Sequence, residues 1–222
     1  MRGFLLILFP AILLAQATQP PQLTTDDEKT VYTLGLTIYR SLGQFDLSPA
    51  ELEIVKRAIS DAAANKPAVD INTYGPKLQA LATGRQAKVA EREKASSKDF
   101  LEKAAAEKGA VKSESGMIYR ELTPGTGESP KATDKVKVNY RGTFINGTEF
   151  DSSYARNQPA EFPLNGVIKC WTEGVQKMKV GGKSRLVCPA AIAYGDGGRP
   201  GIPGGATLVF EIELLSVTGA PK

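Results

Sequence analysis

The stretch "KVKVNYRGTFINGTEFDSS" at residues 135–153 decides how the second half of the chain folds. Val136, Val138 and Tyr140 alternate in it with polar or charged residues. A two-residue period is typical of a strand that turns one face to a core and the other to water, as strands of antiparallel sheets do. The first ten residues of the stretch therefore predict a β-strand.

Three more segments after Gly109 are predicted to be strands, and one short segment between them to be a helix. The last strand alternates large apolar residues with Val209, Glu211 and Glu213. The predicted strands are "MIYREL" at 117–122, "SRLVC" at 184–188 and "TLVFEIELLSV" at 207–217, and the predicted helix is "KCWTEGVQKM" at 169–178. Residues 110–222 are therefore expected to form an α+β domain, in which an antiparallel sheet wraps one short helix.

The first half of the chain follows the 3.6-residue period of helices instead. Thr25 and Glu28 are spaced as a capping box, which marks a helix start. Ser48, Pro49 and Glu51 form a second and stronger start signal, because proline is tolerated in the first helical turn. We therefore predict two helices that begin near these signals.

A third helical stretch begins around Asn72 and runs to Gly109. Its middle is mostly charged residues and alanine, with too few large apolar residues to bury a face. A helix that is polar all round is usually solvated and bridges domains. We therefore predict a long exposed connecting helix at residues 84–109, between a helical segment at 18–83 and the sheet domain at 110–222.

The two N-terminal helices have almost no core of their own. Units of about 40 residues or fewer usually need oligomerisation or covalent links to fold. The apolar face of residues 31–42 is therefore expected to pack against a second copy, which would give a homodimer through residues 25–65. The alternative is that this face folds onto the C-terminal domain.

The chain begins with "MRGFLLILFPAILLAQA" at residues 1–17. Arg2 supplies a positive start, an apolar run follows, and "AQA" has the small residues of a cleavage site. This pattern predicts a secretory signal that is cut after Ala17, with an uncleaved anchor as the alternative. The protein is therefore expected to be exported to the periplasm first of all, or else to the outer membrane or the medium.

The composition bears on the chemistry that the chain can carry out. With no histidine, it lacks the usual general base and the commonest zinc ligand. A net charge of +4 without a basic stripe among aromatic residues predicts no nucleic-acid binding, and we expect no metal and no cofactor. An exported protein meets an oxidising compartment, so Cys170 and Cys188 are expected to form a disulfide; two buried free thiols are the alternative.

Large apolar and aromatic residues gather beside Asp151 in segments of the second half that we expect to be mainly loops. For any one of them, membership of the core is the ordinary interpretation. Glycine and proline surround Tyr194 and Ile202, however, as is typical of a surface loop, where such side chains usually serve a function. The candidate site residues are Tyr140, Phe150, Asp151, Phe162, Val167, Ile168, Trp171, Tyr194, Ile202 and Phe210.

The order of these motifs resembles that of FKBP-type peptidyl-prolyl cis–trans isomerases over about residues 112–217. The resemblance is carried by "KVKVNYRGTFINGTEFDSSYARNQPAEFPL", "VIKCWTEGVQKMKVGGKSRLVCP" and "AIAYGDGGRPGIPGGATLVFEIELL". The helical first half and the export signal further resemble the Mip/FkpA-like subgroup of exported bacterial members, which dimerise through that segment. The resemblance implies isomerisation of X–Pro bonds in exported or unfolded proteins, chaperone activity, and inhibition by tacrolimus-like macrolides.

The resemblance also implies roles for single residues. Trp171 would form the floor under the substrate proline, and Tyr140, Phe150, Val167, Ile168 and Phe210 its walls, with Phe162 and Ile202 completing the apolar cup. The catalytic residues would be Asp151 at the rim, the backbone N–H of Ile168, and the hydroxyl of Tyr194, the last two donating to substrate carbonyls.

The chain departs from the family pattern in ways that bear on substrate preference. Ala160 stands where many members have an aromatic wall residue, and Arg199 where some have histidine. Ala191 and Ile192 replace a polar–aromatic pair before Tyr194.

The reaction itself agrees with a chain that has no histidine. Rotation about the X–Pro bond faces a barrier of about 18–20 kcal/mol, because the C–N bond has partial double-bond character. A twisted imide is less dipolar than a planar one, so an apolar cup favours the transition state and needs no nucleophile or general base. Asp151 then either acts directly on the twisted carbonyl or fixes its own loop. Two other functions stay open: a holdase chaperone with a vestigial pocket, and a purely structural dimer.

Overall fold

The computed structural model describes residues 22–219, so the predicted signal at residues 1–17 lies outside the described part of the chain. Within that part, we find no helix with the length and hydropathy needed to span a membrane. The chain divides into two compact units, one ending at Ile38 and the other beginning at Tyr39.

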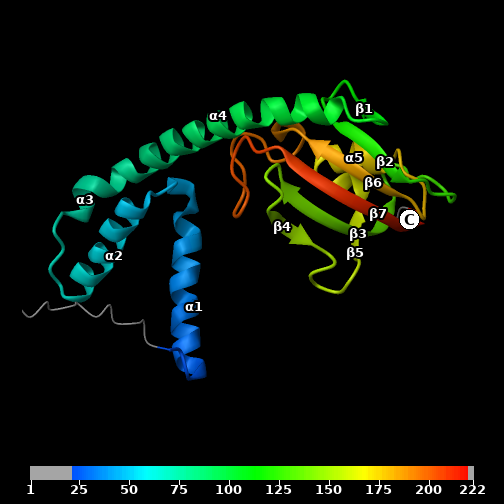
Figure 1. Ribbon diagram of the computed structural model, residues 1–222. Coiled ribbons are helices and arrows are strands. Elements are labelled where there is room, and N and C mark those ends of the chain that lie inside the picture. The colour runs from blue at the N-terminus through cyan, green and yellow to red at the C-terminus, as the bar shows by residue number, and fades with distance from the viewer. Residues whose placement is uncertain (1–21, 220–222) are drawn as a thin grey trace, which may run out of the picture. The chain divides into compact units, whose positions relative to one another are not determined.

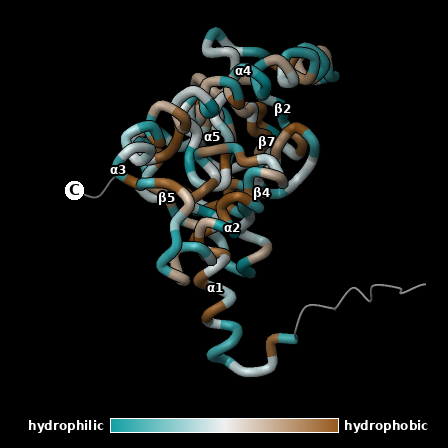
Figure 2. The backbone as a smooth tube through the Cα atoms, turned by 90° about the vertical axis from the view of Figure 1, so that its left-hand side faces the viewer, coloured by the Kyte–Doolittle hydropathy of each residue, from teal (hydrophilic) through white to brown (hydrophobic). Residues whose placement is uncertain are grey.

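Helix α1 (Asp26–Ser41) begins at the predicted capping box. The Glu28 N–H donates to the Thr25 hydroxyl oxygen at 3.2 Å, and the Thr25 N–H donates to the Glu28 carboxylate at 2.8 Å. Backbone donors of Thr25 and Thr24 lower the pKa of Glu28 to about 2. The helix buries none of its residues, although large apolar residues recur along it (Figure 2). A short 3₁₀ turn, η1 (Leu42–Phe45), follows it.

Helix α2 (Pro49–Ala63) confirms the second start signal, with both hydrogen bonds of the Ser48–Glu51 capping box in place. Glu51 also accepts a hydrogen bond from Arg85 Nη1 at 3.1 Å, and this same nitrogen donates to the Phe45 carbonyl at 2.9 Å. Together the Arg85 side chain and the cap hydrogen bonds lower the pKa of Glu51 to about 2. Arg85 lies in the long third helical stretch, so its side chain joins α2 and η1 to that stretch.

The long helix is divided near its start. A short α3 (Ile71–Tyr74) and a 3₁₀ turn, η2 (Gly75–Lys77), precede α4 (Leu78–Ala105), which ends four residues before Gly109. The prediction that residues 84–109 are exposed is wrong at three positions, because α4 buries Ala90, Ser97 and Ala104; it also buries Ala82 just before that range.

Small side chains explain the buried stripe of α4. They let another backbone approach the helix closely. A Cβ atom on Gly205, for example, would lie 2.3 Å from the Ala90 carbonyl oxygen, so only glycine fits opposite Ala90. A pattern search for large apolar residues does not detect a contact surface made of alanine and glycine.

The second half forms one antiparallel sheet of seven strands, in the order β1-β2-β6-β7-β3-β4, with β5 also paired to β3 (Figure 1). Four strands match the four predicted segments, two of which were predicted from alternation, and three short strands were not predicted. The strands are β1 (Ala110–Lys112), β2 (Ile118–Thr123), β3 (Lys135–Phe144), β4 (Glu149–Ser152), β5 (Ala160–Pro163), β6 (Lys183–Cys188) and β7 (Leu208–Thr218).

The main core lies between the sheet and α5 (Lys169–Val175). Val136 and Val138 of β3 are fully buried there, together with Val175 of α5. From β7 the core takes Leu208, Phe210, Ile212 and Leu214, the residues of one period-two face. This confirms the predicted α+β domain, with an antiparallel sheet wrapped on one short helix.

The opposite face of the sheet is covered as well. Val209, which alternation places on the water side, is only 8 % exposed and packs with Val187, Ile118 and Ala104 of α4. Just after α4, the Glu107 carboxylate accepts hydrogen bonds from Arg185 at 2.8 and 2.9 Å. Its Oε2 also lies 2.6 Å from Arg120 Nη1. The end of α4 is therefore part of the sheet domain.

Replacing Ala104 with glutamate tests this docking. Ala104→Glu would place an unpaired carboxylate against the buried Val209 cluster, and we expect it to lower the free energy of unfolding by about 3 kcal/mol. Ala95→Glu makes the same change at an exposed position of α4 and should cost well under 1 kcal/mol. Urea unfolding, followed by the fluorescence of the single tryptophan, measures both. Equal midpoints for the two variants would contradict the docking of α4.

Candidate active site

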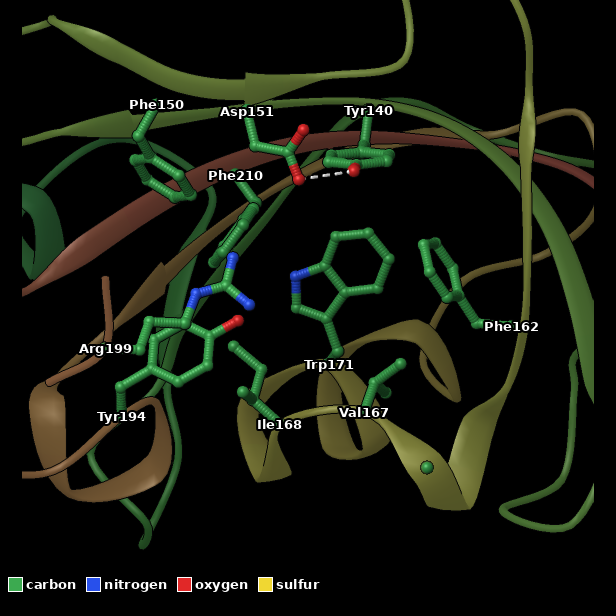
Figure 3. A pocket seen from close by; sticks show the side chains of 11 residues that line it. Tyr140, Phe150, Asp151, Phe162, Val167, Ile168, Trp171, Tyr194, Arg199 and Phe210 are labelled. Atoms are coloured by element: carbon green, nitrogen blue, oxygen red, sulfur yellow. Dashed lines mark hydrogen bonds between the residues drawn. The ribbon is translucent and has the colours of Figure 1, made fainter. Parts of the chain in front are cut away.

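A cavity of about 310 Å³ opens beside α5 and brings together most of the predicted site residues (Figure 3). Nine of the ten line it. The exception is Ile202, which is 5 % exposed and belongs to the core. Gly166 and Arg199 line the cavity although neither was among the predicted site residues. The lining residues are Tyr140, Phe150, Asp151, Phe162, Gly166, Val167, Ile168, Trp171, Tyr194, Arg199 and Phe210.

Trp171 of α5 lies at the floor of the cavity and is 4 % exposed. Three rings from three strands meet it edge to face, with centroids at 5.2 Å for Tyr140, 5.7 Å for Phe162 and 5.3 Å for Phe210. Such edge-to-face pairs stabilise an aromatic cluster by about 0.5–1.5 kcal/mol each beyond the burial of area. The indole is thereby held from three sides.

The indole nitrogen of Trp171 has no hydrogen-bond partner, although it is buried. In Figure 3 this nitrogen lies on the side of the indole that is turned toward Phe210. Buried polar groups without a partner are uncommon in folded proteins. The floor residue therefore carries one buried donor without a partner, within an otherwise apolar cluster.

Phe150 and Asp151 lie on the short strand β4, not in a loop as expected. Asp151 pairs with Gly142 of β3. A Cβ atom on Gly142 would lie 2.7 Å from the Phe150 ring, so glycine at this position lets the ring lie over β3. A four-residue strand is too short to show an alternating pattern, which explains why the sequence did not predict it.

Both carboxylate oxygens of Asp151 are engaged. The Tyr140 hydroxyl donates to Oδ2 at 2.6 Å, and Arg156 Nη1 donates to Oδ1 at 2.5 Å. Arg156 Nη2 also donates to the Tyr140 oxygen at 2.8 Å, which closes a ring of three side chains (Figure 3 draws the Tyr140–Asp151 bond). Asp151 is therefore held by Tyr140 of β3 and by Arg156 at the same time.

The pKa values of two members of this ring are shifted in opposite directions. Burial alone would raise the pKa of Asp151, but hydrogen bonds from Tyr140 and Arg156 outweigh it and hold that pKa below its ordinary value. Burial, followed by the hydrogen bond to Asp151, raises the pKa of Tyr140. Asp151 is therefore an anion and Tyr140 a protonated donor at neutral pH.

Ile168 is the N-cap of α5, and its carbonyl accepts the first hydrogen bonds of the helix, from Trp171 at 2.9 Å and Thr172 at 3.1 Å. Backbone N–H groups at a helix start have no partner within the helix. The N-terminal end of α5 thus brings backbone donors and the Ile168 side chain to the cavity wall.

A disulfide joins Cys170 of α5 to Cys188 at the end of β6, with 5.7 Å between the Cα atoms. Both cysteines are fully buried. Cys170 precedes Trp171 directly, so the bond attaches the floor of the cavity to the sheet.

The Gly- and Pro-rich segment after η4 (Ala190–Ile192) carries Tyr194 and Arg199 to the cavity. Backbone hydrogen bonds run both ways between Arg199 and Ile202, at 2.9 and 2.8 Å. Ile202 is buried beneath this turn, which explains why it anchors the loop and does not line the cavity. The Arg199 guanidinium lies 4.4 Å from the centroid of the Tyr194 ring.

Comparison with known proteins identifies both halves of the chain. A family model described as FKBP-type peptidyl-prolyl cis-trans isomerase matches residues 126–215, and one described as the domain amino terminal to it matches residues 27–120. FKBP-type peptidyl-prolyl cis-trans isomerase FkpA of Escherichia coli K12 is 40% identical over 210 residues, which cover 89% of this chain and 78% of that protein.

Two further comparisons agree. The FKBP-type 22 kDa peptidyl-prolyl cis-trans isomerase of the same organism is 38% identical over 202 residues, which cover 89% of this chain and 98% of that protein. The crystal structure of FkpA from Escherichia coli superposes with a TM-score of 0.67 at 39% identity, covering 90% of this chain and 100% of that one.

The lowered pKa of Asp151 predicts a pH-dependent contribution to stability. A carboxyl group whose pKa is lower in the folded state stabilises the fold above its ordinary pKa of about 3.8, and this contribution is lost as the pH falls through the folded value. Asp151→Asn should therefore lower the urea midpoint at pH 7, and its difference from the unmodified protein should shrink by pH 3.

The control for this measurement is Asp99→Asn, which alters an exposed carboxylate of α4 and should leave the midpoint at pH 7 nearly unchanged. A difference between Asp151→Asn and the unmodified protein that stays the same from pH 7 to pH 3 would show that the charge of Asp151 does not stabilise the fold.

Proposed function

The chain belongs to the family of FKBP-type peptidyl-prolyl cis–trans isomerases, as the resemblance implied, and from this premise we propose how the cavity around Trp171 carries out the reaction. The observation that supports the proposal is the apolar cup itself, in which three rings surround the indole edge to face. The substrate is the peptide bond that precedes a proline.

The proline ring of the substrate rests on Trp171, and the X–Pro bond rotates within the aromatic walls. Twisting the bond removes the resonance that keeps it planar, and with it part of the dipole of the imide. Water stabilises the planar, more dipolar form better than the twisted form. An apolar cup gives the planar form no such advantage. The cavity therefore binds the transition state more tightly than the ground state, which is what accelerates the reaction.

Polar groups at the edge of the cup hold the substrate backbone. The Tyr194 hydroxyl and the Ile168 N–H donate to substrate carbonyls. Asp151 acts as a fixed negative charge at the rim. Since Tyr140 and Arg156 already engage both of its oxygens, it works through the position of these two side chains and through its field.

Removing the Tyr194 hydroxyl tests this assignment. Tyr194→Phe loses one hydrogen bond to the substrate, and we expect kcat/KM to fall about tenfold, which corresponds to about 1.4 kcal/mol. A protease-coupled assay on a proline-containing peptide measures it, and tacrolimus should abolish catalysis by the unmodified protein. Tyr154→Phe, an exposed tyrosine outside the cavity, is the matched control and should stay within about twofold.

Two outcomes of this assay would count against the proposal. Equal activity of Tyr194→Phe and the unmodified protein would remove Tyr194 from the site. A folded, unmodified protein that catalyses no isomerisation would overturn the function itself.

The N-terminal helices support a second proposal, that the protein is a homodimer through residues 25–65. Val31, Tyr32 and Leu34 of α1 are 69 %, 56 % and 60 % exposed, and helix α2 likewise buries none of its residues. A chain that leaves so many large apolar side chains in water normally covers them with a partner. A second copy is the partner that is always present at equal concentration.

Two acidic substitutions on α1 test the dimer. The double variant Val31→Asp, Leu34→Asp should be monomeric by light scattering, because two charges would have to be buried in the contact. Its kcat/KM on a short peptide should stay within about twofold, since α1 is remote in sequence from the cavity residues. The control Thr33→Asp, Thr37→Asp alters exposed polar positions of the same helix and should remain a dimer. A dimeric Val31→Asp, Leu34→Asp variant would contradict the proposal.

The clients that fit these features are exported proteins that are not yet folded. Uncatalysed X–Pro isomerisation takes tens to hundreds of seconds and can limit folding. A leader of the kind predicted at residues 1–17 would bring the enzyme to the periplasm or another part of the envelope. The exposed apolar residues of α1 and α2 favour a chaperone activity beside the isomerase, since two joined sites hold a flexible chain more firmly than one.

A further inference from the structure

The rim of the cavity carries an unequal set of charges. Asp151 is the one acidic residue of the lining, and its charge is balanced by Arg156, which binds it at 2.5 Å. Arg199 lines the same cavity, and the other lining residues carry no charge at neutral pH. The rim therefore keeps one positive charge that Asp151 does not balance.

The one acidic residue in the loop of Arg199 is already paired with a lysine of helix α4. The loop of residues 194–205 contains a single acidic residue, Asp196. Its carboxylate binds Lys94 of α4 at 2.6 Å. Among residues 22–219, no carboxylate lies within ion-pair distance of the Arg199 guanidinium, which lies over the Tyr194 ring.

The backbone holds Arg199 where its charge reaches the cavity. The two hydrogen bonds between Arg199 and Ile202 fix the turn, and the buried Ile202 side chain anchors it to the core. The guanidinium stacks on Tyr194, and Figure 3 shows it between that ring and Phe210. A cation over an aromatic ring is attracted to its face, so the contact keeps the side chain at the rim.

We infer that Arg199 is a specificity-determining residue, which favours substrates with an acidic side chain directly before the proline and disfavours lysine or arginine there. This rests on the proposed function. Because the bond that rotates joins that residue to the proline, its side chain must lie at the rim in every state of the reaction. Its charge then interacts with the unpaired guanidinium, across a boundary between apolar walls and water.

The size of the effect follows from exposed ion pairs. A pair at an exposed rim changes affinity about threefold. A substrate with an acidic residue before the proline should bind about threefold more tightly, and one with a basic residue about threefold more weakly. The ratio of kcat/KM between the two substrates should therefore be about tenfold. High salt should reduce the ratio, because the interaction is screened over about 8–10 Å.

The experiment uses three acetylated and amidated peptides, Ala-Glu-Pro-Phe, Ala-Gln-Pro-Phe and Ala-Lys-Pro-Phe, whose only charge is at the variable position. Catalysed cis–trans exchange is measured by NMR exchange spectroscopy at subsaturating peptide, which yields relative kcat/KM without a coupled protease. The protein is the full mature chain, compared with Arg199→Gln, Arg199→Lys and Arg199→Glu. Lys112→Gln, on β1 at the other edge of the sheet, removes the same charge far from the cavity and is the control.

We expect the Glu-to-Lys ratio of kcat/KM to be about tenfold in the unmodified protein and in Lys112→Gln. It should be largely kept in Arg199→Lys, fall close to one in Arg199→Gln, and reverse in Arg199→Glu. A loss of structure would slow all three peptides alike and leave the ratio unchanged.

Two results would overturn the inference. Equal ratios in the unmodified protein and Arg199→Gln would show that Arg199 does not select the substrate, while catalysis of all three peptides would leave the proposed function intact. Absence of catalysis on every peptide would instead overturn the proposed function, and this inference with it.

Discussion

The edge-to-face packing of three rings around Trp171 is the contact on which the rest of the site depends. Tyr140, Phe162 and Phe210 come from β3, β5 and β7, so the indole of α5 joins the helix to three strands at once. Because each ring is part of both the core and the cavity wall, the site cannot form before the sheet closes on the helix. Stability and activity therefore rest on the same side chains.

The periphery of the site is arranged around this centre. Hydrogen bonds among Asp151, Arg156 and Tyr140 fix the position of the Tyr140 hydroxyl, and with it one wall of the cavity. Helix α4 contacts the loop of residues 194–205, through Ala90 against Gly205 and Lys94 against Asp196. A helix that looks like a simple spacer in sequence thus supports the loop that carries Tyr194 and Arg199.

The sequence predicted what repeated patterns encode. Alternation over ten residues located β3 and β7, and side-chain spacing located the caps of α1 and α2, because these signals act between neighbours in the chain. The three strands of three or four residues were missed, since so few residues show no period. The buried stripe of α4 was missed because alanine gives no hydrophobic signal, and Val209 was misplaced because the helix that covers it lies a hundred residues away in sequence. Nine of the ten predicted site residues line the cavity, and Ile202 belongs to the core. Arg199 was not predicted, because the turn between Arg199 and Ile202 that brings it to the cavity leaves no pattern in the sequence.

The Cys170–Cys188 bond has a consequence for how long the floor of the site lasts. Exchange of a disulfide needs a thiolate to reach one of its sulfurs, and both of these cysteines are fully buried. A reductant can therefore act only on molecules that have already opened locally. The bond closes a loop of 18 residues, and such a link stabilises a fold by about 3 kcal/mol. The disulfide thus stabilises the fold, and the fold shields the disulfide from reductants. Once formed, the bond persists when the surroundings become reducing, as long as the core around it stays closed.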